Sequence, residues 1–158
     1  MLQFRSILHP TDFSPNSAEA FRFACALARD CEARLIVVHA VEPAPAMVGE
    51  AALVPYELEE LREQARRKLD ELRPTDPDIR METMVRDGPA PAVILDAADE
   101  FGADLIVMGT HGRTGLKRLF LGSVAELVLR RAHCPVLTVK EPAHASNMRA
   151  DHATAAKS

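Results

Sequence analysis

The feature that most constrains the fold of this chain is a regular alternation of short apolar runs with segments whose apolar residues recur at helical spacing. Residues 34–41, RLIVVHAV, are almost continuously apolar, as is typical of a central strand covered on both faces. Apolar runs at 5–9, 104–108 and 136–139 predict further strands, and the alternating run at 79–85 predicts a strand near a sheet edge. Together they predict an α/β fold with one doubly wound parallel sheet, right-handed crossovers and helices on both faces.

The segment after the first strand predicts a helix with a clear start. Ser14 is a favourable N-cap residue, and Pro15 suits the first helical position. One face of this helix carries apolar residues at the spacing of a buried stripe. They are Phe21, Ala24, Cys25 and Ala28.

Two more helices follow the second and third strands. An apolar stripe among charged residues predicts an amphipathic surface helix, which Pro74 and Pro77 end. Its members are Leu58, Leu61, Ala65, Leu69 and Leu72. The next helix begins at Pro89 and has Gly102 as its C-cap. Its predicted inward residues are Ile94, Ala97, Ala98 and Phe101.

These elements predict a single domain over residues 1–140 of the 158-residue chain. Residues 42–55 contain three prolines and are expected to form a long loop. Residues 141–158 lack any apolar period and are expected to be a mobile tail without chemistry.

Charge and hydropathy bound the function. The net charge is −4, so the overall basic surplus typical of nucleic-acid binders is lacking and no nucleic-acid partner is expected. No apolar run is long enough to span a membrane, and residues 1–10 lack the layout of a secretory signal, which predicts a cytoplasmic protein with no membrane partner. Cys25, Cys31 and Cys134 lack zinc-site spacing and are expected to be reduced, buried residues.

Four of the seven glycines cluster directly after the fourth predicted strand, at Gly109, Gly112, Gly115 and Gly122. Glycines that precede a helix N-terminus let backbone N–H groups point at a phosphate, although glycines can also serve tight turns alone. The helix that follows is predicted over residues 123–133, where Ser123 and Glu126 have capping-box spacing.

Two residues at the carboxyl ends of other strands could each have either a ligand-binding or a structural role. Asp12 follows the first strand, where its carboxylate suits a ribose hydroxyl or a base amine, or satisfies backbone N–H groups of its own turn. His39, near the end of the second strand, is better explained as a packed strand-end histidine than as a ligand.

Several catalytic and nucleotide motifs are absent from the sequence. There is no Walker A loop, no Gly-x-Gly-x-x-Gly and no Gly-x-Ser-x-Gly elbow. No nucleophile–base pair or acid–base carboxylate pair is recognisable, so the sequence indicates no catalytic site.

Three stretches together resemble the universal stress protein family over about residues 2–140. These are Pro10-Thr11-Asp12 after the first strand, VVHAV on the second, and the run MGTHGRTG…LGSVAE…CPVLTV. The resemblance, to the ATP-binding branch, implies an adenine-nucleotide alpha-hydrolase-like sheet with strand order 3-2-1-4-5. It also implies bound ATP, or AMP or ADP. Mg²⁺ beside the phosphates is compatible with this, but no ligand set in the sequence demands it.

The resemblance assigns parts of the nucleotide to particular residues. The adenosine would face Pro10, Thr11, Asp12, Met108 and Gly109, and the backbone of Ala40. The phosphates would lie at Gly112, Gly122, Ser123 and Val124, flanked by His111 and Arg113, with Gly115 in the same loop. Ala125 departs from the pattern, because it stands where that branch often has a hydroxyl residue.

The family also implies a homodimer through the last strand, Val136, Leu137, Thr138 and Val139. That strand is apolar and would be an exposed edge in a monomer, which proteins usually cover. The first functional hypothesis is a dimeric nucleotide-dependent stress sensor or regulator that acts on a downstream protein. A slow Mg-dependent ATPase or phosphotransferase and a nucleotide-free interaction protein are the alternatives.

Overall fold

The computed structural model describes residues 3–42, 55–111 and 121–140, and it confirms the predicted alternation there. The strands are β1 (Ser6–Pro10), β2 (Arg34–Val41), β3 (Met81–Asp87), β4 (Leu105–Gly109) and β5 (Val136–Val139). The helices are α1 (Pro15–Asp30), α2 (Pro55–Glu71), α3 (Ala90–Glu100) and α4 (Ser123–Arg131). The tail predicted over residues 141–158 and most of the loop predicted over 42–55 lie outside the described residues.

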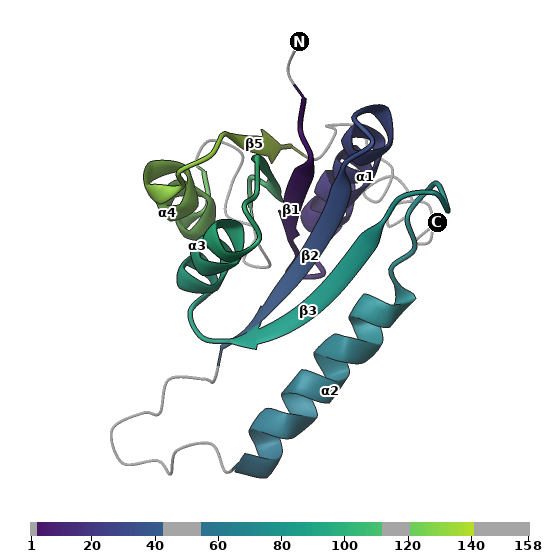
Figure 1. Ribbon diagram of the computed structural model, residues 1–158. Coiled ribbons are helices and arrows are strands. Elements are labelled where there is room, and N and C mark those ends of the chain that lie inside the picture. The colour runs from purple at the N-terminus through teal and green to yellow at the C-terminus, as the bar shows by residue number, and fades with distance from the viewer. Residues whose placement is uncertain (1–2, 43–54, 112–120, 141–158) are drawn as a thin grey trace, which may run out of the picture.

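The five strands form one parallel sheet in the order β3-β2-β1-β4-β5, which confirms the predicted topology. Right-handed crossovers place α1 and α2 on one face and α3 and α4 on the other, as Figure 1 shows. The strand order reverses between β1 and β4, so ligands are expected beyond the carboxyl ends of these two strands.

Alternate residues of the central strands supply two apolar layers. On the α1 and α2 side Ile7, Val37 and Val107 pack with Phe21 and Leu69. On the α3 and α4 side the layer includes Leu8, Ile36, Ile106, Ile94 and Val128. No helix among the residues described here has the length and apolarity needed to cross a membrane.

The structure corrects several element boundaries. β3 begins at Met81 rather than at Ile79, because the Ile79 N–H bonds to the Asp76 carbonyl in a turn before the strand. α4 ends at Arg131 rather than at 133, since the next residue is already extended. The C-cap of α3 is Phe101, and Gly102 follows it with φ +56°, the left-handed position that ends many helices.

Burial also differs from expectation at a few positions. Leu61 is 37% exposed, so the buried part of the α2 stripe is centred on Ala65 and Leu69. Phe101 is half-buried and lies under the Arg34 and Arg86 guanidinium groups, 6.0 and 5.6 Å from its ring centroid.

The three cysteines are free, as expected, but only Cys25 is fully buried. Cys31 and Cys134 are half-buried, because Cys31 caps the end of α1 and Cys134 lies in the turn before β5. Burial raises the pKa of the Cys25 and Cys134 thiols, which keeps both in the neutral form.

Candidate functional site

A cleft opens where β1 and β4 diverge. Their pairing stops at Leu8 and Ile106, whereas β1 stays paired with β2 as far as Pro10. The cleft has a volume of about 550 Å³, and we call it the switch-point cleft. All predicted site residues that the structure describes line it: Pro10, Thr11, Asp12, Ala40, Met108, Gly109, His111, Gly122, Ser123 and Val124. Gly112, Arg113 and Gly115 lie outside the described residues.

The turn after β1 is held by its own side chains. Asp12 Oδ1 accepts the Ser14 N–H at 2.9 Å, so the turn reading of this aspartate is confirmed, and the carboxylate also lines the cleft. Thr11 donates its N–H to the Val38 carbonyl at 2.9 Å, and its hydroxyl oxygen accepts from Ser17 Oγ at 2.9 Å. Ser14 caps α1 as predicted, accepting the Ser17 N–H at 3.1 Å. The turn is therefore a preformed wall of the cleft.

A second wall is built from β2 and α2. His39 Nδ1 donates to the Thr11 carbonyl at 2.7 Å, and its ring lies 4.5 Å from that of Phe13, which confirms the packed reading of this histidine. Lys68 Nζ lies 5.3 Å from the centroid of the Phe13 ring, within reach of a cation–π contact. Lys68 and Gln64 both line the cleft, although they lie among the polar residues of a helix that is expected to be an amphipathic surface helix. Their helical spacing from Leu61 is the signal that could have found them.

The N-terminus of α4 supplies backbone donors. Gly122 is the N-cap, and its own N–H bonds to the Thr110 carbonyl at 2.8 Å. The predicted capping box is wrong, because Ser123 is already the first helical residue, so the helix begins one residue earlier than that motif requires. No side chain of the described residues caps the helix, and Glu126 instead pairs with Arg130 at 2.8 Å. The first N–H groups of α4 therefore face the cleft without an acceptor inside the helix.

A buried histidine bridges β1 and β4 where the two strands diverge. His9 is fully buried, and its Nδ1 donates to the Val107 carbonyl at 2.8 Å, just past the last paired residues of β1 and β4. Burial lowers the pKa of His9 to about 4, although the Val107 carbonyl and Asp12 act in the opposite direction. The ring is therefore neutral at physiological pH, and its side chain replaces a ladder hydrogen bond that the divergence of the strands removes.

The first residues after β4 are also tightly held. The Thr110 N–H bonds to the Val139 carbonyl at 3.1 Å, and Thr110 Oγ1 lies 2.9 Å from His111 Nδ1. His111 Nε2 is buried and has no hydrogen-bond partner within the part of the chain that is described. An unpaired buried nitrogen on the cleft wall is a candidate ligand contact.

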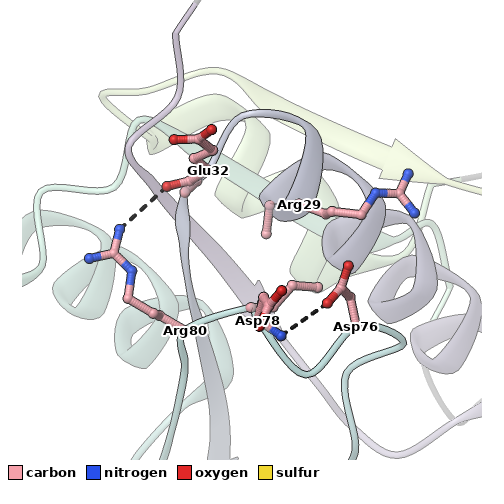
Figure 2. A pocket seen from close by; sticks show the side chains of 8 residues that line it. Arg29, Glu32, Asp76, Asp78 and Arg80 are labelled. Carbon is pink, nitrogen blue, oxygen red and sulfur yellow. Dashed lines mark hydrogen bonds between the residues drawn. The ribbon is translucent and has the colours of Figure 1, made fainter.

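A second cavity of about 260 Å³ lies near the amino ends of β2 and β3, at the other end of the strands from the switch-point cleft (Figure 2). Arg80 donates to the Glu32 carbonyl at 3.4 Å, and the Asp78 N–H bonds to the Asp76 carboxylate at 2.9 Å. The charged side chains that line this second cavity are of both signs and mostly exposed, so they do not converge on a ligand. Within residues 3–42, 55–111 and 121–140 no cluster of three or more histidines, cysteines or acids could hold a metal ion.

The sheet order, the cleft at its switch point and the helix N-terminus beside it define a doubly wound α/β protein with an open cleft at the carboxyl ends of its strands. The family model of the universal stress protein family matches residues 3–140. The chain belongs to this family.

Two curated relatives illustrate the similarity. The universal stress protein MJ0531 of Methanocaldococcus jannaschii is 38% identical over 88% of this chain and 84% of its own length. The universal stress protein in the QAH/OAS sulfhydrylase 3'region of Thermus aquaticus is 39% identical over 87% of this chain and 99% of its own.

Solved structures show the same fold. The structure of MJ0577 superposes with a TM-score of 0.75 at 28% identity, covering 89% of this chain and 99% of the other. A universal stress protein in complex with cAMP matches with a TM-score of 0.60 at 25% identity, over 88% and 98% of the two chains. The Archaeoglobus fulgidus universal stress protein in complex with dAMP matches with a TM-score of 0.54 at 25% identity, over 89% of this chain and 100% of the other.

Proposed function

We propose that this chain is a cytoplasmic stress-response protein that binds an adenine nucleotide, ATP or AMP/ADP, in the switch-point cleft. It would act as a nucleotide-dependent sensor or regulator in the form of a homodimer. The observation that carries the proposal is the convergence of a carboxylate, apolar walls and an uncapped helix N-terminus on one cleft of about 550 Å³. Two structural neighbours are complexes with the adenine nucleotides cAMP and dAMP, which supports the same ligand class.

The lining residues fit the three parts of such a ligand. Pro10, Ala40 and Met108 offer apolar surface and backbone groups to a purine. The Asp12 carboxylate is an acceptor for a ribose hydroxyl. The N–H groups of Ser123 and Val124 suit phosphate oxygens, because the positive end of the α4 dipole adds to their attraction.

The remaining assigned residues belong to the same proposal. We propose that His111, which lines the β4 side of the cleft and has an unpartnered Nε2 among the described residues, contacts a phosphate. Thr11, Gly109 and Gly122 shape the backbone around the ligand. By resemblance to the family, Gly112, Arg113 and Gly115 complete the phosphate loop.

The decisive experiment removes one backbone donor and leaves the helix intact. Proline is well tolerated at the first helical position, and the extended Gly122 before it (ψ 152°) is compatible with a following proline. Ser123→Pro should therefore fold normally, as judged by circular dichroism, and lose one phosphate contact. We expect its ATP affinity in calorimetry to fall about tenfold or more, because hydrogen bonds to charged groups are worth about 1.5–3 kcal/mol.

The matched control is Ser123→Ala, which keeps the backbone N–H and loses only the hydroxyl. Both variants should be titrated with ATP, AMP and adenosine, with and without Mg²⁺. Equal ATP affinities for the folded proline variant and the wild type would refute the phosphate site. Mass analysis of nucleotide released from denatured, freshly purified protein identifies the ligand carried from the cell.

We propose that the homodimer forms through β5, because this strand is exposed at the edge of the sheet. Among the described residues this strand is last in the sheet order and pairs with β4 alone, and all four of its side chains are half-exposed. The carbonyls of Pro135 and Val139 accept hydrogen bonds from the β4 side, so by alternation the backbone of Thr138 points outward.

Thr138→Pro should therefore block pairing through this edge while β4 stays paired. Sedimentation equilibrium should give a monomer for this variant and a dimer for Thr138→Val. A Thr138→Pro protein that remains dimeric would overturn the proposed interface.

A further inference from the structure

The first turn of α1 carries a buried amide that reaches the residues after β4. Asn16 is 8% exposed, although it lies near the start of a helix where asparagine usually faces water. Its amide orientation is assigned from its partners. The nitrogen donates to the Val139 carbonyl at 3.0 Å, and the oxygen accepts the His111 N–H at 3.3 Å and lies 3.4 Å from Thr110 Oγ1. One side chain thus joins α1, the end of β5 and the residues that enter the glycine-rich loop.

The same amide explains why residue 109 is a glycine. A Cβ placed on Gly109 would lie 2.8 Å from the terminal atom of the Asn16 amide and 3.2 Å from its Cγ. The Asn16 main-chain carbonyl carbon would be 3.3 Å away, which is tight but less severe. A larger residue at position 109 would therefore have to displace the hydrogen-bonded Asn16 amide, whether or not a ligand is present.

These contacts make the start of α1 a common support for both walls of the cleft. Ser14 and Ser17 hold the turn that contains Asp12, as described above. Asn16 lies between these serines in sequence and holds the backbone on the β4 side. The Asp12 turn and His111 are thereby both hydrogen-bonded to the N-cap and first turn of α1, through Ser14, Ser17 and Asn16.

We propose that Asn16 is a positioning residue of the switch-point cleft, which fixes the backbone from Gly109 to His111 against α1 so that an adenine nucleotide meets both walls. This proposal rests on the proposed function for its ligand, but the positioning itself is measurable without one. Asn16 does not line the cleft, so it acts through the residues that it holds.

The test is a double-mutant cycle between Asn16→Ala and Gly109→Ala. Gly109→Ala alone should weaken AMP and ATP binding about tenfold or more, because the new methyl group displaces the Asn16 amide and the backbone that it holds. Asn16→Ala alone should weaken binding by a similar factor. In the Asn16→Ala background, Gly109→Ala should cost less than about threefold, because the clashing side chain is gone.

Two further readouts separate positioning from general stability. In ¹⁵N-labelled protein without ligand, the His111 amide resonance should shift upfield in Asn16→Ala and stay near its wild-type position in Asn16→Asp, which keeps the acceptor oxygen. The unfolding free energies of the wild type, the two single alanine variants and the double variant provide the same cycle without nucleotide. If the wild type binds no nucleotide, these two measurements still decide the role of Asn16.

Equal costs of Gly109→Ala in both backgrounds, by affinity or by unfolding free energy, would overturn the proposal. An unmoved His111 resonance in Asn16→Ala would do the same. Should Asn16→Ala fail to fold, Asn16→Ser, with a shorter polar side chain, takes its place in the cycle with the same expected sign.

Discussion

The buried imidazole of His9 between β1 and β4 predicts an acid sensitivity that can be assigned to one residue. The folded protein holds His9 neutral with a pKa of about 4, whereas in the unfolded chain the pKa is 6.5. The unfolded chain therefore takes up a proton first as the pH falls, so unfolding free energy is lost from about pH 6.5 down to about pH 4. The full difference corresponds to about 3 kcal/mol, of which about 2 kcal/mol is lost between pH 7 and pH 5.

His9→Asn isolates this contribution. The asparagine amide can still donate to the Val107 carbonyl but cannot be protonated, so the variant should be less stable than the wild type at pH 7 and less sensitive to acid. Urea unfolding followed by circular dichroism at pH 7, 6 and 5 measures both proteins. We expect the stability difference between them to shrink by about 2 kcal/mol over this range.

The matched control is His133→Asn, because the His133 side chain is 85% exposed and pairs only loosely with Asp99 at 3.3 Å. This variant should follow the wild type at every pH. Parallel pH profiles for wild type and His9→Asn would refute the reasoning, since they would mean that His9 is not held neutral in the folded state.

Three further predictions test the fold. Ile106→Ala should cost about 2–5 kcal/mol of unfolding free energy, because the side chain is fully buried, whereas Leu129→Ala, at a half-exposed position, should change it by less than about 0.5 kcal/mol in the same urea titration. Gly102→Ala should cost about 1 kcal/mol through its left-handed backbone alone, since nothing lies within 4 Å of the added methyl group, and Gly102→Asn should cost less in thermal unfolding. Asp104→Ala should cost about 1–2 kcal/mol by leaving the N–H groups at the start of β1 without their carboxylate acceptor, and unchanged urea unfolding would count against that role.

Much of this architecture was predictable from sequence, and the reasons are local. The strand over residues 34–41 is predicted with its observed bounds because it is buried on both faces and reads as one apolar run. Ser14 and Pro15 mark the start of α1 because capping is decided by neighbouring residues. At α4 the same logic assigns the cap to Ser123, but a tertiary hydrogen bond from Gly122 to Thr110 makes the glycine the cap instead.

The residues that the sequence did not reveal act through long-range contacts. Asn16 looks like an ordinary polar residue in the first turn of a helix, and its burial depends on the ends of β4 and β5, more than ninety residues away. His9 looks like the polar end of a strand, and its role depends on the divergence of β1 from β4. No periodicity or motif encodes either contact.

The short pairing between β1 and β4, which we call the seam, has a consequence for the proposed nucleotide binding. β1 and β4 pair in register at two positions, Ile7–Leu105 and Leu8–Ile106, which is fewer than the strands within either part of the sheet. A nucleotide bound across this seam would act as a non-covalent cross-link between them. At a concentration one hundred times its Kd it would add about 2.7 kcal/mol to the unfolding free energy. The melting temperature of the protein would then rise with the nucleotide concentration. Its lifetime in the cell would be longer when more of it is bound to nucleotide.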